Sequence, residues 1–110
     1  MANHPITITG INTAENKLIL SDNGHTYVDP GDTVSWLIGQ NSGVSAITAI
    51  NDDVAADVFS PDPSKVGNSN NWQGTVNSNI ARGSVENYTI VYTKSTGEAC
   101  AYDPKIEVNP

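Results

Sequence analysis

The residues of this chain that are best suited to binding a ligand surround Trp72. Asn70 and Asn71 precede this tryptophan, and Gln73 follows it. An indole ring can stack on the apolar face of a sugar, while side-chain amides form hydrogen bonds with the sugar hydroxyls. These four residues are therefore a candidate saccharide-binding set. A tryptophan that anchors a long loop onto a β-sandwich has the same sequence surroundings, so both interpretations stay open at this point.

Acidic residues are the second group with recognisable chemistry. Carboxylate oxygens are the hard ligands that calcium prefers. The spacing of the acids lacks the Asp-x-Asp-x-Asp-Gly pattern of a known calcium loop. Two hypotheses follow, calcium-assisted ligand binding or a solvated acidic loop, and neither assigns a metal to the protein. The residues concerned are Asp52, Asp53, Asp57 and Asp62.

Catalysis has no recognisable constellation in the sequence. His25 has no second histidine or carboxylate at the spacing of a known catalytic motif, and no serine lies in a Gly-x-Ser-x-Gly turn. A glycine-rich phosphate loop is also absent. Cys100 has Glu98 and Asp103 as charged neighbours, which disfavours a reactive thiolate and predicts a small buried apolar residue. We expect a protein that is not an enzyme and needs no cofactor.

The elements that must position these residues are strands. Apolar and polar residues alternate in short runs that end at Gly, Pro, Asn and Asp, which is typical of an all-β domain. Trp36 alternates with Val34 and is expected in the core. The clearest runs cover residues 6–9, 17–20, 25–28, 33–38, 44–50 and 86–93, with weaker ones at 72–76, 99–102 and 105–108. They predict a single domain over residues 1–110, a β-sandwich of Greek-key type with seven to eight strands.

Composition restricts the partners. The chain has 110 residues and a formal net charge of −7, which disfavours nucleic acid and anionic membranes. Only 15% of the residues are charged and 37% are apolar, so the remainder is mostly the small polar residues of turns and strand faces. A single cysteine excludes an intrachain disulfide. The first residues lack a signal-peptide pattern, which predicts a cytoplasmic protein, or a secreted or periplasmic one if a signal has been removed.

Two stretches resemble the cupredoxins, a family of small blue-copper β-sandwiches. Residues 28–36 read Val-Asp-Pro-Gly-Asp-Thr-Val-Ser-Trp, similar to the Val-x-x-Gly-Asp-Thr-Val-x-Trp signature of that family's second and third strands. Residues 88–94, with Gly97 and Cys100 after them, look like the strand pair that delivers the family's copper-ligating cysteine. The resemblance implies a cupredoxin-like sandwich in which residues 105–108 form the last strand.

The copper ligands of that family are missing from the corresponding positions. A blue-copper site needs two imidazoles and a thiolate. Residues 37–43 contain no histidine, and residues 101–110 contain neither histidine nor methionine. The two histidines, His4 and His25, precede the first matching stretch. The resemblance therefore implies the fold in a copper-free form, with a tight turn at Asp103-Pro104 in place of the ligand loop.

These observations predict a non-catalytic binding or assembly module. The segment 51–73 breaks the strand pattern and contains two prolines, and long irregular loops on a rigid sandwich often carry the contacts. The partner is expected to be an unidentified protein or a saccharide. A lectin-like saccharide-binding protein, with calcium assistance through Asp52 and Asp53, is the alternative. Edge strands that pair between two copies would give a homodimer.

Overall fold

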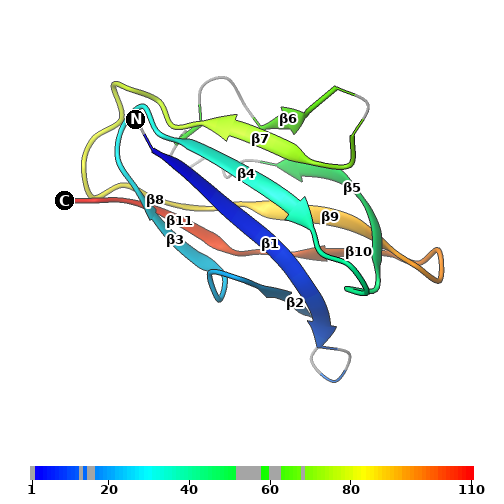
Figure 1. Cartoon of the computed structure of the whole chain (residues 1–110). Helices are drawn as coiled ribbons and strands as arrows, with labels where there is room; N and C mark the ends of the chain where they lie inside the picture. Colours follow the sequence, from blue (N-terminus) through cyan, green and yellow to red (C-terminus); the bar gives the residue numbers. More distant parts are fainter. Residues whose placement is uncertain (1, 13, 15–16, 52–57, 60–62, 68) are drawn as a thin grey trace.

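The computed structural model is a two-layered β-sandwich (Figure 1). It describes residues 2–12, 14, 17–51, 58–59, 63–67 and 69–110. Within these ranges every regular element is a strand, and no helix is long and apolar enough to cross a membrane. The strands are β1 (Asn3–Asn12), β2 (Lys17–Leu20), β3 (His25–Val28), β4 (Thr33–Ile38), β5 (Val44–Asn51), β6 (Ser64–Lys65), β7 (Trp72–Thr75), β8 (Val85–Asn87), β9 (Thr89–Lys94), β10 (Ala99–Tyr102) and β11 (Lys105–Val108).

One layer is a five-stranded sheet in the order β2-β1-β4-β7-β6. Its centre is a parallel pair, in which β1 lies beside β4 from Asn3 opposite Thr33 to Ile8 opposite Ile38. On its other side β1 pairs with β2 in the antiparallel sense, and the register shifts between Ile8 and Gly10. This bulge lets the last residues of β1 follow β2 away from the rest of the sheet.

The other layer is built on two long strands, each interrupted once. β8 continues into β9 after Tyr88, and β10 continues into β11 after Asp103 and Pro104. β9 pairs with β10 and β8 pairs with β11 in one unbroken antiparallel register. The amide of Tyr88 donates to the carbonyl oxygen of Pro104 at 3.1 Å and joins the two ladders. Pro104 has no N–H to return that bond, which explains the interruption. β5 flanks this layer beside β9, and β3 flanks it beside β11.

The prediction of an all-β sandwich is confirmed. When β8 with β9 and β10 with β11 are each counted as one strand, the eleven segments reduce to eight longer strands and the two-residue β6. The expected tight turn at Asp103-Pro104 is wrong. Because Tyr102 pairs with Ile90 and Lys105 pairs with Asn87 in the same register, the chain runs straight through these two residues.

Alternation of buried and exposed residues along the strands produces a single core. Trp36 is fully buried, as predicted, and its indole N–H donates to the Tyr88 hydroxyl at 3.1 Å. The Trp36, Tyr88 and Phe59 rings meet edge to face, with centroids 5.5 to 6.4 Å apart, the arrangement that aromatic quadrupoles favour. This aromatic cluster joins the two layers, because Trp36 belongs to β4 and Tyr88 lies between β8 and β9.

The buried carboxylate of Asp32 holds the N-terminal segment against the start of β4. It accepts hydrogen bonds from the amides of Ala2 and Asp29 and lies 2.8 Å from Nε2 of His4. Burial alone would raise the pKa of Asp32, but these hydrogen bonds and the charge of His4 outweigh it and lower the pKa to about 2. The Asp32 carboxylate is therefore ionised in the folded protein at neutral pH.

Candidate binding site

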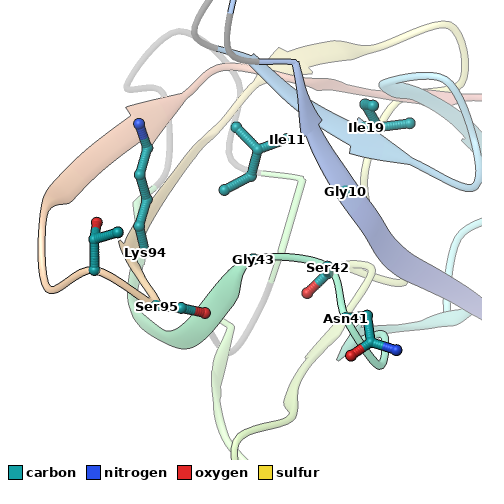
Figure 2. A pocket seen from close by; sticks show the side chains of 9 residues that line it. Gly10, Ile11, Ile19, Asn41, Ser42, Gly43, Lys94 and Ser95 are labelled. Atoms are coloured by element: carbon teal, nitrogen blue, oxygen red, sulfur yellow. The ribbon is translucent and has the colours of Figure 1, made fainter.

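A hollow in the described surface lies where β1 and β4 separate (Figure 2). The last backbone hydrogen bond between them runs from the Gly39 amide to the Ile8 carbonyl oxygen at 2.8 Å. Beyond this point β4 turns away into the β4–β5 turn, whereas β1 continues beside β2. Gly10 and Ile11 consequently line a space that a neighbouring strand would otherwise fill.

Two turns close the opposite side of this hollow. The β4–β5 turn contributes Asn41 and Gly43, which have positive φ angles of 59° and 84°. The β9–β10 turn contributes Ser95 and Thr96. The Ser95 amide donates to the Gly43 carbonyl oxygen at 2.8 Å, so the two turns are held together and give the hollow a fixed wall.

The chemistry of the hollow is an apolar surface with one cation among its described lining residues. Its volume is about 440 Å³, within the range of roughly 300–1,000 Å³ that is usual for small-molecule sites. Ile11 and Ile19 supply apolar surface, and Ile19 is 47% exposed. The Lys94 side chain is only 18% exposed, and its ammonium lies 3.4 Å from the largely exposed Glu98 carboxylate. Figure 2 shows Lys94 and Ile11 toward one side of the hollow and Asn41 and Ser42 toward the other.

A smaller hollow of about 200 Å³ adjoins β2. Ile19 lines both hollows, and Tyr102 of β10 lines the smaller one. The two hollows therefore adjoin each other at this residue of β2. Together they place apolar surface along the edge of β2, outside the closed core.

Trp72 lies at the seam between the two layers. It stands directly opposite Trp36 in the β4–β7 pair, and its half-buried ring packs against the core. Its indole N–H donates to the Ile47 carbonyl oxygen of β5 at 3.1 Å. These contacts match the interpretation of Trp72 as an anchor between loop and sandwich. Among its predicted companions, Asn70 and Gln73 are exposed and Asn71 is half-buried.

The remaining predicted site residues do not come together in the part of the chain that the structure describes. Asp52, Asp53, Asp57 and Asp62 lie outside it. His4 contacts Asp32, and Nε2 of His25 lies 3.0 Å from Glu107. Cys100 is a half-buried free thiol that packs against the core, less enclosed than predicted. No three His, Cys, Asp or Glu side chains in the described ranges are grouped as metal ligands would be.

Sequence reasoning missed the hollow over Ile11, Ile19 and Lys94. One local signal was present, because Lys17-Leu18-Ile19-Leu20 places an isoleucine on the face opposite the two leucines. A single exposed apolar side chain is common on protein surfaces, so this signal alone does not mark a contact surface. Most of the other lining residues come from turns far along the chain, and nothing in their own sequence marks them.

No protein-family model and no curated protein matches this chain.

Proposed function

We propose that this protein is a non-catalytic binding module, built on a copper-free sandwich of cupredoxin-like, Greek-key connectivity. The family likeness in this proposal rests on two stretches of sequence, residues 28–36 and 88–100. The two parallel pairs, β1 with β4 and β3 with β11, are the features of the fold that support it. The binding role rests on the hollow beside Gly10 and Ile11.

The absence of catalysis in this proposal is supported by the surroundings of the reactive side chains. The His4 and His25 rings are each engaged by a separate carboxylate, on Asp32 and Glu107. In the described ranges neither histidine has a hydrogen bond to a serine, threonine or cysteine that it would activate as a nucleophile. These rings therefore serve the structure of β1 and β3 in this proposal.

The single observation that carries the binding role is a hollow in which the apolar side chains of half-buried Ile11 and exposed Ile19 adjoin the mostly buried side chain of Lys94. Ile11 and Ile19 suit an apolar group, and Lys94 suits an anion. The chain has only five Lys and Arg residues against twelve acids. Positive side chains are therefore scarce in this protein, and Lys94 places one of them beside an apolar hollow. The ligand class that fits is a small amphipathic anion.

A fluorescent probe of that chemistry tests the proposal. 1-Anilinonaphthalene-8-sulfonate joins an aromatic body to a sulfonate and becomes bright when its rings leave water. We expect saturable, one-to-one enhancement with the native protein. Thr96→Trp, which places a large ring at the mouth of the hollow, is expected to remove most of the enhancement.

Two controls make the test specific. Ser78→Trp places the same ring at an exposed position in the loop after β7 and is expected to leave binding unchanged. Near-ultraviolet circular dichroism excludes loosened packing, because partly unfolded states also bind this dye. Equal enhancement from the native protein and Thr96→Trp would contradict the proposed site.

Saccharide binding by the 51–73 segment is the second candidate. The exposed amides of Asn70 and Gln73 beside the half-buried Trp72 ring favour it. Asn70→Ala combined with Gln73→Ala would weaken sugar binding without lowering thermal stability, because both side chains are exposed and none of the side-chain hydrogen bonds found among the described residues involves them. Titration with an oligosaccharide panel, followed by calorimetry, measures this effect.

A further inference from the structure

The free edge of β1 points to the form of the ligand. β1 bonds to β4 only as far as Ile8, and from Gly10 onward it has β2 alone as a partner among the described strands. The backbone of Gly10 and Ile11 therefore presents an unpaired strand edge to the hollow. Such an edge can take up an extended peptide, whose main chain supplies hydrogen bonds while its side chains enter adjoining pockets.

The other long edge of the sandwich is protected. β5 has two register shifts against β9, and such bulges hinder pairing with another strand. The Ile47 carbonyl oxygen on β5 already accepts the Trp72 indole N–H. Within the ranges that the structure describes, β1 shows no such bulged pairing on its free side from Gly10 onward, although Gly43 lies against the Ile11 side chain. A hollow lined by turns adjoins the edge there.

Lys94 indicates which part of a peptide would enter the hollow. Its ammonium is the only cation among the described residues of the lining, and the Ile11 side chain on the same side of β1 is apolar. Ile19 pairs with Gly10, whereas Ile11 pairs with Leu18, so Ile19 lines the hollow from the other face of the β1–β2 pair. A peptide C-terminus joins an apolar side chain to a carboxylate within one residue, which matches this pairing. An internal peptide segment would bring no anion to this ammonium and would leave it with the exposed Glu98 carboxylate.

We propose that the hollow binds the C-terminal residues of an extended peptide. The peptide main chain adds beside Gly10 and Ile11 in the place that β4 leaves, its last side chain rests on Ile11, and its carboxylate meets Lys94. This inference rests on the proposed binding role of the same hollow and names the ligand class.

The probes are fluorescein-labelled hexapeptides of sequence Gly-Ser-Thr-Ser-Thr-X, in which X is Ala, Val, Leu or Phe. Each is made with a free C-terminal carboxylate and as the C-terminal amide, and binding is followed by fluorescence anisotropy. We expect the carboxylate forms with Val, Leu or Phe to bind and the amides to bind at least about tenfold more weakly. Methylating the amide nitrogen of residue X is expected to weaken binding further if the main chain pairs with β1.

Variants assign the effect to named residues. Lys94→Met keeps the apolar stem and removes the ammonium, so it is expected to lower carboxylate binding to the level of the amide. The matched control is Lys65→Met, because Lys65 is exposed on β6 and does not line the hollow. Thermal denaturation of each variant verifies that the fold is retained.

Each outcome decides between the two proposals. Discrimination between carboxylate and amide that disappears in Lys94→Met supports the peptide proposal. Equal binding of the two forms, or full displacement of the peptides by octanoate at equal concentration, overturns it. Dye binding that depends on Thr96 without any peptide binding overturns it as well, yet leaves the proposed function standing. Failure of both dye and peptides overturns both.

Discussion

Two buried tyrosines provide a matched test of how polar groups are accommodated in this core. Tyr88 is 1% exposed and Tyr92 is 0% exposed. The Tyr88 hydroxyl accepts the Trp36 indole N–H at 3.1 Å. The Tyr92 hydroxyl makes no hydrogen bond to nitrogen or oxygen within the described residues, and its polar neighbour is the weakly bonding thiol of Cys100, its cross-strand partner. The perturbation is the same for both, replacement of tyrosine by phenylalanine, which removes one oxygen and keeps the ring.

The two substitutions are expected to change the free energy of unfolding by different amounts or in opposite directions. Tyr88→Phe leaves the indole N–H of a fully buried Trp36 without its acceptor, which costs about 1–3 kcal/mol of unfolding free energy. Tyr92→Phe removes a buried hydroxyl that gains little from the fold, so its effect lies between about zero and 1 kcal/mol of stabilisation. Burial raises the pKa of both tyrosines, so both hydroxyls are neutral at ordinary pH.

Urea denaturation followed by tryptophan fluorescence measures the difference. For a domain of this size a loss of about 2 kcal/mol lowers the urea midpoint by roughly 1 M at unchanged slope. Tyr88→Phe is expected to show this shift, and Tyr92→Phe is expected to show none or a small rise. Equal losses in the two variants would refute the reasoning, because they would mean that the hydroxyls are equally well bonded.

Further predictions concern backbone fit and pH. A Cβ at Gly39 would lie 2.6 Å from the Ile8 carbonyl oxygen, whereas one at Gly10 would lie 3.6 Å from the nearest atom of Ile19. Gly39→Ala should therefore lose about 1–3 kcal/mol of stability in thermal or urea unfolding, and a Gly10→Ala loss of the same size would contradict this. Because the pKa of Asp32 falls from 3.8 to about 2 on folding, its ionised form stabilises the protein by about 2 kcal/mol above pH 4, and this is lost as the pH falls through 2. The stability difference between the native protein and Asp32→Asn should shrink over that interval in urea titrations, and a difference that stays constant would show that the Asp32 carboxylate is not the cause.

Strand positions were predictable because their signals are local. Residues 17–20, 25–28 and 33–38 form strands with the predicted bounds, since alternation and turn residues lie within each segment. Pairing is a different problem. That β1 bonds in parallel to β4, or that β3 joins β11, depends on contacts between distant parts of the chain, which a single sequence does not encode as a pattern.

The same distinction applies to the candidate site. Trp72 was conspicuous in the sequence because its neighbours are amides, but the hollow combines residues 10, 11 and 19 with residues 41–43 and 94–96. Those segments meet only because a bulge after Ile8 redirects β1 and because Ser95 bonds to Gly43. Two lining residues depart from the alternation of their own strands: Ile19 is an apolar residue on an exposed face, and Lys94 is a charged residue that follows the buried Ile90 and Tyr92 on the inward face of β9.

The hydrogen bonds at two edges of the sandwich, along β5 and along β1, explain why the binding role is proposed for the β1 edge. At the β5 edge the Trp72 indole N–H is already bonded to Ile47, and its ring contributes to the core, so a ligand stacked there would compete with contacts that support the fold. At the β1 edge Gly10 and Ile11 adjoin a formed hollow, and occupation would add hydrogen bonds without breaking any that the described chain makes. A binding surface that the fold leaves open in this way needs no rearrangement on association, which is the physical reason for preferring it.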